Sequence, residues 1–203
     1  MIKIEKNVVG ILESNSWIVY GDESKNCLII DLGGDFLRIF DRIRTLGLKP
    51  SALLLTHGHF DHTACAAKAH ENGIPVYISE RDAYMLDSAA SSLATAFGVR
   101  FEPLAERQTV REGVYEIGGF SVEVIETPGH TAGSVCYKIG DGMFCGDTVF
   151  KYGYGRYDLP TGSFADLQNS FKKLAAYSAL RLYCGHGDDT SLEEEKKYNP
   201  MFR

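Results

Sequence analysis

The chain has 203 residues, of which 44% are hydrophobic and 24% charged, so it can bury a core without disulfides and is expected to form one domain over residues 1–203. Its formal net charge of −6 at pH 7 disfavours nucleic-acid binding, which calls for a basic surface. No apolar run approaches the roughly 20 residues of a membrane span, and residues 1–10 lack a signal-peptide core, so we expect a soluble cytoplasmic protein without membrane contact.

Short strands are predicted in the first third of the chain, separated by Asn, Ser, Gly and Asp residues. These strands are Ile2–Glu5, Gly10–Glu13, Trp17–Gly21 and Cys27–Asp31. A helix is expected over Asp35–Leu46, because its apolar residues recur at a spacing of three or four and Gly47 follows. A compact apolar strand, Ser51–Leu55, then leads into the segment Thr56–His62.

The remaining elements alternate less regularly. Helices are predicted at Thr63–Glu71, Glu80–Leu86, Phe164–Tyr177 and Ser191–Tyr198. Strands are predicted at Pro75–Ile78, Tyr115–Ile117, Ser121–Glu126, Ser134–Ile139, Met143–Cys145 and Ala179–Cys184. The segment Ser88–Glu106 has little periodicity and is interpreted as a covering segment. Two batches of strands, with helices between and after them, predict two packed sheets with helices outside.

Four metal-ligand side chains occur within the segment Thr56–His62, directly after an apolar strand. They are His57, His59, Asp61 and His62. One small ion takes about four ligands and usually keeps a place for water, so these side chains are expected to diverge toward two neighbouring ions. The alternative is a polar turn in which the histidines occur by chance. We disfavour it because bringing four such polar side chains together costs free energy unless they bind something.

Three more predicted strands end in a glycine-flanked ligand side chain, at His130, Asp147 and His186. Glycine lets the backbone approach closely and adopt turns that are closed to other residues. A Gly-Asp turn alone is more often structural, but these segments and Thr56–His62 together use five of the six histidines. The sixth, His70, lies in a predicted helix and is expected at the surface.

The motifs T-H-x-H-x-D-H, T-P-G-H-T, G-D-T and G-H-G occur in this order and resemble those of the metallo-β-lactamase superfamily. The resemblance covers nearly the whole chain and implies an α/β (α+β) fold, a four-layer αββα sandwich of hydrolases. It implies that His57, His59 and His130 bind one metal ion, that Asp61, His62 and His186 bind a second, and that Asp147 bridges both. Imidazole and carboxylate ligands without thiolate suit two divalent ions, with zinc as our first choice and iron or manganese as alternatives.

Within the superfamily, the chain is similar to the glyoxalase II-like branch of hydroxyacylglutathione hydrolases. The likeness lies in Thr131–Ser134, Gly146–Phe150 and the loop Gly153–Ser163. It implies that Arg156 binds substrate near the metals, whereas the alternative is a solvated arginine paired with Asp158. Two departures stand out: the chain ends soon after His186, where we expect a carboxyl-terminal helical domain to be missing, and Asp158 replaces a tyrosine. Glutathione thioesters are therefore one candidate substrate among several.

The predicted chemistry is hydrolysis of a small-molecule acyl substrate, with a thioester favoured. Metal coordination lowers the pKa of a bridging water from 15.7 to about 7, so that hydroxide can attack a carbonyl at neutral pH. Asp61 is the predicted catalytic residue, because as a ligand it can also hold the hydroxide's proton. A thioester suits such a site, since its good leaving group needs little help from a general acid.

Several alternatives use the same ligands. A lactonase or a persulfide dioxygenase with a single iron would fit, whereas a β-lactamase is disfavoured because those enzymes generally replace the aspartate found here at Asp147. An RNA-processing nuclease would want a basic surface. A site that only stabilises the fold or binds a partner is the non-catalytic alternative. The five cysteines are expected to be buried apolar residues, with Cys184 alone near a ligand, and the sequence leaves the oligomeric state open.

Overall fold

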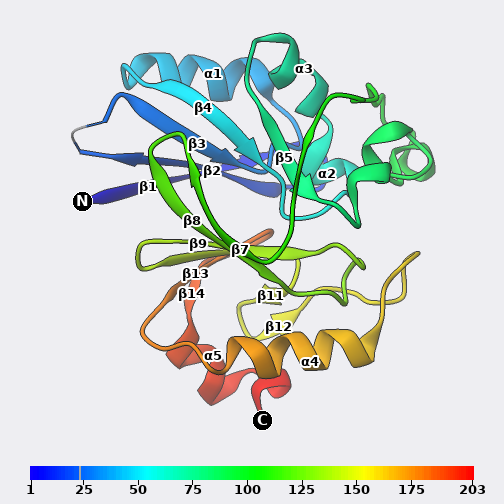
Figure 1. Ribbon diagram of the computed structural model, residues 1–203. Helices are drawn as coiled ribbons and strands as arrows, with labels where there is room; N and C mark the ends of the chain where they lie inside the picture. Colours follow the sequence, from blue (N-terminus) through cyan, green and yellow to red (C-terminus); the bar gives the residue numbers. More distant parts are fainter. Residues whose placement is uncertain (23) are drawn as a thin grey trace.

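The computed structural model describes residues 1–22 and 24–203, which form four layers (Figure 1). Two six-stranded sheets face each other. Helices α1 (Phe36–Thr45) and α3 (Ala66–Glu71) cover the first sheet, and α4 (Phe164–Leu174) and α5 (Leu192–Tyr198) cover the second. The αββα sandwich implied by the sequence is therefore confirmed.

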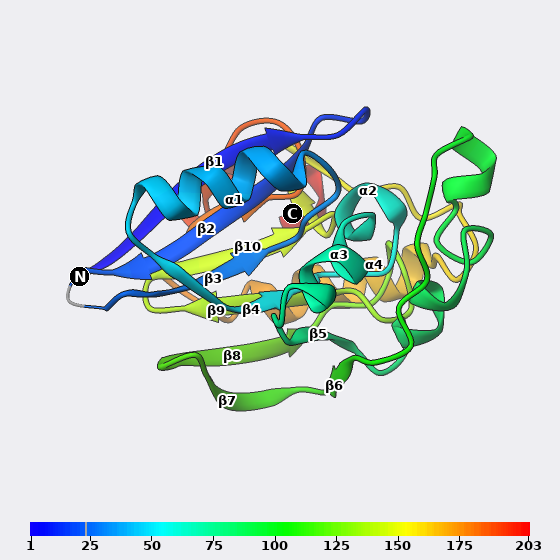
Figure 2. The same ribbon diagram turned by 90° about the horizontal axis from the view of Figure 1, so that it is seen from above.

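The first sheet is antiparallel at one side and parallel at the other. In spatial order it contains β1 (Ile2–Val9), β2 (Ser14–Gly21), β3 (Asn26–Ile30), β4 (Lys49–Leu54), β5 (Val76–Ser79) and β6 (Gln108–Val110). The pairs from β3 to β6 are parallel, so these strands all end at one edge of the sheet. Figure 2 shows α1 lying across β1, β2 and β3, with residues 88–106 beyond the strand ends, on the side where α2 lies.

The second sheet is antiparallel except for one pair. Its order is β14 (Thr190–Ser191), β13 (Arg181–Cys184), β10 (Gly142–Gly146), β9 (Val135–Ile139), β8 (Phe120–Glu126) and β7 (Gly113–Ile117). Strands β10 and β13 are parallel, and a small hairpin of β11 (Val149–Phe150) and β12 (Gly153–Tyr154) follows β10. Within residues 1–22 and 24–203, no helix has the length and apolar content needed to cross a bilayer.

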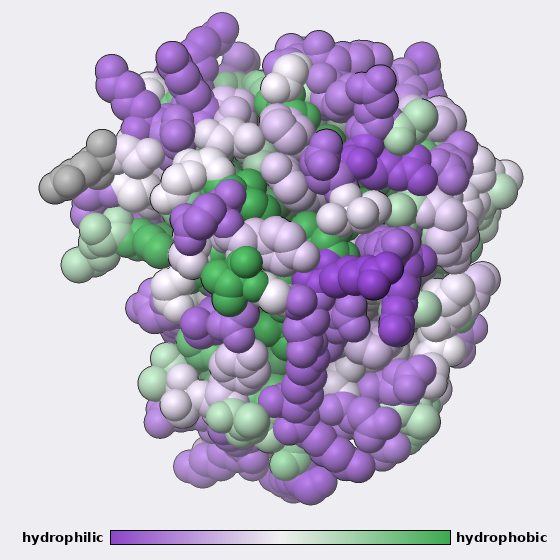
Figure 3. Space-filling view, viewed as in Figure 1, coloured by the Kyte–Doolittle hydropathy of each residue, from purple (hydrophilic) through white to green (hydrophobic). Residues whose placement is uncertain are grey.

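Alternating side chains of the strands build three apolar cores. Leu28 and Ile30 of β3 lie between the two sheets, whereas Cys27 and Ile29 of the same strand pack toward the first helical layer. Strands covered on both faces must be apolar at every position, which explains the continuous runs near β3 and β4. The face seen in Figure 3 is mostly polar, and its apolar surface gathers in the middle band, where the sheets meet.

Three sequence predictions were wrong in part or in full. Gly10–Glu13 is not a strand but the turn between β1 and β2, where both end residues have left-handed backbone, with φ of 69° and 54°. Glu80–Leu86 is not an α-helix; a short 3₁₀ helix, η1 (Ala83–Asp87), stands there. The helix predicted at Thr63–Glu71 is divided into α2 (Phe60–Thr63) and α3, because the backbone leaves the helical conformation near Cys65.

Several short elements were not predicted. Strands β6, β11, β12 and β14 have only two or three residues each, too few for an alternating pattern to be visible. The covering segment Ser88–Glu106 contains one 3₁₀ helix, η2 (Ala94–Phe97), and another, η3 (Pro200–Phe202), follows α5. The other predicted strands and helices are present, with ends shifted by one to four residues.

Candidate metal centre

The seven predicted ligands lie in four segments that follow β4, β8, β10 and β13, with Asp61 and His62 in the short helix α2, and the fold brings these segments to one place. The amide of Val135 donates to the carbonyl of Thr56 at 2.9 Å, which joins the end of β4 to the start of β9. Since β8 runs antiparallel to β9, its end lies at the same edge. The amide of Gly185 donates to Gly146 at 2.7 Å, which joins the loops after β10 and β13.

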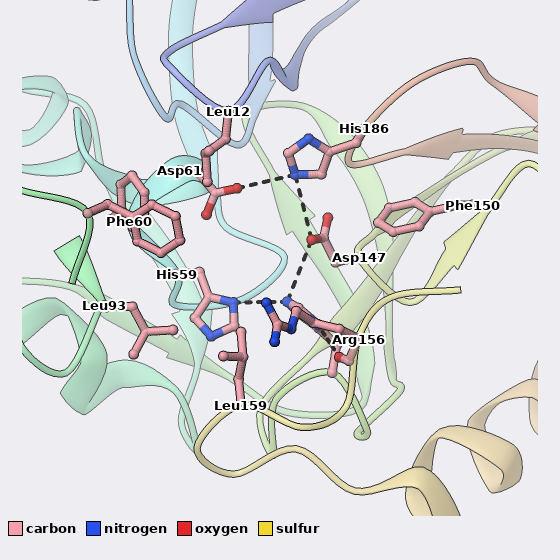
Figure 4. Close-up of a pocket in the computed structure, with 12 residues that line it drawn as sticks. Leu12, His59, Phe60, Asp61, Leu93, Asp147, Phe150, Arg156, Leu159 and His186 are labelled. Carbon is pink, nitrogen blue, oxygen red and sulfur yellow. Dashed lines mark hydrogen bonds and ion pairs between the residues drawn. The ribbon is translucent and has the colours of Figure 1, made fainter. Parts of the chain in front are cut away.

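The ligand atoms form three overlapping groups, in each of which they lie within 4.8 Å of one another. The groups are His57, His59 and His130; His57, His62 and Asp147; and Asp61, His62 and His186. Within the first, Nδ1 of His59 lies 2.9 Å from Nε2 of His130, and in the third, Nε2 of His186 lies 3.2 Å from Oδ2 of Asp61 (Figure 4).

Asp147 stands between the two outer groups. Its Oδ1 lies 3.2 Å from Nε2 of His62, and its Oδ2 lies 3.6 Å from Nε2 of both His130 and His186. One carboxylate therefore faces ligands of both predicted ions. This is the arrangement that a shared ligand requires.

Hydrogen-bond partners set the tautomers of three histidines. Nδ1 of His62 donates to Oδ2 of Asp31 at 2.8 Å, and Nδ1 of His130 donates to the carbonyl of Arg156 at 2.7 Å. Nδ1 of His57 lies 3.1 Å from Oγ1 of Thr56, whose own proton goes to Asp31, so this nitrogen also donates. In the neutral form of each ring, Nε2 is thus left with a lone pair directed into the cluster.

Three buried atoms of this cluster indicate that a cation fits it. Nε2 of His57, Nε2 of His59 and Oδ1 of Asp147 are all buried without a hydrogen-bond partner. Burying such acceptors unpaired costs free energy, and a bound cation would remove that cost. The nitrogen and oxygen donors present match the preferences of divalent metals such as zinc, iron or manganese.

Electrostatics keep part of the cluster in its metal-binding form. Burial, reinforced by neighbouring imidazoles, lowers the pKa of His57 well below its ordinary value and that of His59 to about 3. Both rings are therefore neutral at pH 7, as metal binding requires. His62 is different: burial opposes its charge, but Asp147, Asp61 and Asp31 outweigh burial and raise its pKa.

Close backbone packing holds the ligand loops. A Cβ added to Gly33 would lie 1.4 Å from the carbonyl oxygen of Asp61, so only glycine lets the loop after β3 pass beneath the ligand segment. The hydroxyl of Ser14 donates to the same carbonyl. The amide of the next residue, Asn15, donates to the carbonyl of Gly185 at 2.7 Å and holds the loop that carries His186.

Two buried aspartates at this site were missed by sequence reasoning. Asp31 accepts hydrogen bonds from the amide and the hydroxyl of Thr56, both at 2.8 Å, as well as from His62. Asp82 accepts three hydrogen bonds from the loops that carry His57, His59 and His130. A signal existed for Asp31, an acidic residue directly after an apolar strand, but it was assigned only to the strand end.

A cavity of about 280 Å³ opens onto the cluster. Its walls are mostly apolar, and they include Leu12, Phe60, Leu93, Phe97, Phe150 and Leu159. In Figure 4 the labelled apolar side chains surround the carboxylates of Asp61 and Asp147. The covering segment Ser88–Glu106 thus does contribute to the site, through Leu93 and Phe97.

Arg156 also lines the cavity, as predicted. Its Nε and Nη2 donate to the two carboxylate oxygens of Asp158 at 2.8 and 2.9 Å, and both side chains are more than half exposed. The pairing that the sequence raised as an alternative is therefore present. Cys184 is buried, and His70 lies 3.4 Å from Glu106, away from the cluster.

Comparison with known proteins identifies the family. The family model described as the metallo-beta-lactamase superfamily matches residues 9–186. The chain belongs to this superfamily. With its buried histidine and aspartate cluster, this member of the metallo-β-lactamase superfamily is a metallo-hydrolase.

Three similar proteins carry different descriptions: a hydroxyacylglutathione hydrolase, a di-iron-bound protein and a β-lactamase. Hydroxyacylglutathione hydrolase GloC of Haemophilus influenzae is 34% identical over 98% of each chain. The crystal structure of TTHA1623 in a di-iron-bound form is 32% identical, with a TM-score of 0.86 over 97% of this chain and 98% of that one. BLEG-1, a B3 metallo-β-lactamase, is 29% identical, with a TM-score of 0.92 over 98% of this chain and 99% of that one.

Proposed function

We propose that this metallo-hydrolase cleaves activated acyl substrates, thioesters first among them, at a two-metal site. The observation that carries the proposal is the position of Asp147 between two groups of ligands, with its Oδ1 facing His62 and its Oδ2 facing His130 and His186. A single ion could be coordinated by only one of these two groups, and the other group would bind no ion.

The ligands divide naturally between the two ions. His57, His59 and His130 would hold one ion, Asp61, His62 and His186 the other, and Asp147 both. The di-iron form of TTHA1623 supports a pair of ions on this fold. Zinc, iron and manganese all suit these donors, and we keep zinc as the first choice.

The chemistry needs few groups beyond the ligands. Two bound ions would supply a Lewis acid for the carbonyl oxygen and would lower the pKa of a water to about 7. Asp61 lines the cavity, where its carboxylate can accept a hydrogen bond from the attacking hydroxide and orient it. The apolar walls reduce competing water and accommodate the acyl chain.

The leaving group is the reason for favouring a thioester. Among the described residues that line the cavity, none is a lysine, tyrosine, serine or cysteine. A thiol has a pKa of about 8.5 and departs as a thiolate without a strong proton donor. The relative named hydroxyacylglutathione hydrolase GloC matches along 98% of its own length, which supports keeping glutathione thioesters in the substrate class.

A β-lactam is the second candidate, because BLEG-1 matches this chain over nearly its full length with a TM-score of 0.92. A lactone, or persulfide oxidation at a single iron, is a further alternative. The decisive experiment assays purified protein, with its metals quantified, on a glutathione thioester, a β-lactam, a lactone and a phosphodiester. Oxygen consumption is followed with a persulfide.

We expect about two ions per chain and the highest kcat/KM on the thioester. Asp147→Ala removes the shared ligand and should lower both metal content and activity. Asp141→Ala, at the turn before β10, serves as the control and should retain both. Turnover confined to the β-lactam or the lactone would refute the thioester proposal, and a firm limit of one ion would refute the two-metal site.

A further inference from the structure

We infer that Asp82 is a positioning residue for one half of the metal centre, the half formed by His57, His59 and His130; this rests on the two-metal function proposed above. Asp82 is not a ligand, because its carboxylate is occupied by other groups. It ties together the two loops from which these three histidines come.

The ties are three hydrogen bonds. Oδ2 of Asp82 accepts from the amide of Gly58 at 3.0 Å and from the hydroxyl of Thr131 at 2.6 Å, and Oδ1 accepts from the amide of Gly133 at 2.8 Å. Gly58 stands between His57 and His59, whereas Thr131 directly follows His130. One carboxylate therefore sets the distance between the two loops.

Burial makes this arrangement demanding. Asp82 is 0% exposed, and within residues 1–22 and 24–203 it forms no salt bridge. A buried carboxylate without a cation is costly, so its three donors are the interactions that offset desolvation. This buried carboxylate, despite its desolvation cost, lies at the point where it directly sets the positions of the two loops.

Two glycines permit the close approach. A Cβ on Gly133 would lie 2.5 Å from Oδ1 of Asp82, and one on Gly58 would lie 2.5 Å from Cβ of Met85 in η1. Both amides can therefore reach the carboxylate only because neither residue has a side chain. The loops and the start of η1 fit together as a unit around Asp82.

The other half of the centre has separate supports. His62 is oriented by Asp31 at 2.8 Å, and the loop of His186 is held by Asn15. No hydrogen bond in the described part of the chain joins Asp82 to Asp61, His62 or His186. Removing the hydrogen bonds of Asp82 should therefore disturb the positions of His57, His59 and His130. The positions of Asp61, His62 and His186 should not change.

The test uses metal-free full-length protein titrated with Zn²⁺ in a metal buffer, with bound zinc counted at each free concentration. Asp82→Asn keeps the shape of the side chain but replaces one carboxylate oxygen by an amide NH₂ group. This donor then faces one of the groups that donate to Asp82 in the wild type. We expect one of the two ions to bind 10–100-fold more weakly, the usual effect of losing such a partner. The other ion should keep its wild-type affinity, which leaves a plateau at one ion per chain.

Smaller changes guard against misfolding. Thr131→Val removes one of the three donors with little change in shape and should weaken the same ion by a smaller factor, and Thr131→Ser should restore the wild-type curve. Tyr177→Phe is the matched control, because it removes a part-buried 2.7 Å hydrogen bond to Glu123, within β8 and outside the loops that carry the ligands. It should lower the melting temperature while both ions bind as in the wild type.

The outcomes separate the two hypotheses. If the variants at Asp82 and Thr131 lose both ions in parallel, or lose neither, the positioning role is wrong. If Tyr177→Phe also loses one ion selectively, general destabilisation explains the effect and the inference is again wrong. A wild-type protein that binds only one ion would instead refute the two-metal proposal. If Asp82→Asn does not fold, the Thr131 variants decide.

Discussion

Nδ1 of His62 donates a 2.8 Å hydrogen bond to Oδ2 of Asp31, while Nε2 of the same ring faces Oδ1 of Asp147 at 3.2 Å. Asp31 directly follows β3, and its Oδ1 also accepts from the amide of Thr56, two residues after the end of β4. One buried carboxylate therefore joins two parallel strands and orients a ligand ring. The metal centre is built on the sheet, not only on its loops.

Asp31→Asn tests this orientation. The asparagine amide must point a donor either at the backbone amide of Thr56, where two donors oppose each other, or at His62, where it favours the other tautomer and removes the lone pair of Nε2. We expect metal affinity to fall 10–100-fold, measured by competition with a chelator. Asp41→Asn, on the exposed face of α1, is the control, and equal affinities for the two variants would contradict the proposed role of Asp31.

Metal removal should destabilise the fold. The ligands come from four distant segments, so each bound ion links parts of the chain that unfolding would separate. An ion present at 100 times its Kd stabilises the folded state by about 2.7 kcal/mol. We expect chelation to lower the melting temperature by several degrees and zinc to restore it. An unchanged melting curve, with metal removal verified, would count against the site.

Gly33→Ala should be poorly tolerated. The added Cβ would lie 1.4 Å from the carbonyl oxygen of Asp61, and both backbones must move apart. Overpacking of this kind costs about 1–3 kcal/mol or more, measurable by urea unfolding. Gly21→Ala is the control, because its nearest neighbour would be 3.8 Å away, and its effect should stay within about 0.5 kcal/mol. Similar unfolding free energies for the two variants would contradict the close approach.

Arg156 should act in binding and not in the chemical step. Arg156→Ala should raise KM for a glutathione thioester with kcat nearly unchanged, which is the signature of lost uniform binding. Asp158→Asn frees the guanidinium from its carboxylate partner and should lower that KM. A neutral N-acetylcysteamine thioester serves as the control substrate. If both variants leave KM unchanged on the anionic substrate, Arg156 has no role in recognition.

Local patterns predicted much of the fold. Cys27–Asp31 and Ser51–Leu55 are continuous apolar runs, which strands covered on both faces require. The error at Gly10–Glu13 has a physical cause, because Ile11 and Leu12 suggested a strand although they stand on an exposed turn. Their side chains are 68% and 37% exposed, and Leu12 lines the cavity.

The sequence by itself predicted the candidate ligand set, since histidines and aspartates in short glycine-flanked motifs are local features that need no partner to be seen. Tertiary structure alone decided how those ligands are held. Asp31 reaches Thr56 across 25 positions, and Asp82 reaches Gly133 across 51. Such contacts depend on strand register and on how the two sheets pack, which no local pattern encodes. The apolar walls of the cavity likewise became visible only in three dimensions, and the structure showed that the pairing of Arg156 with Asp158, raised from the sequence as an alternative, is present.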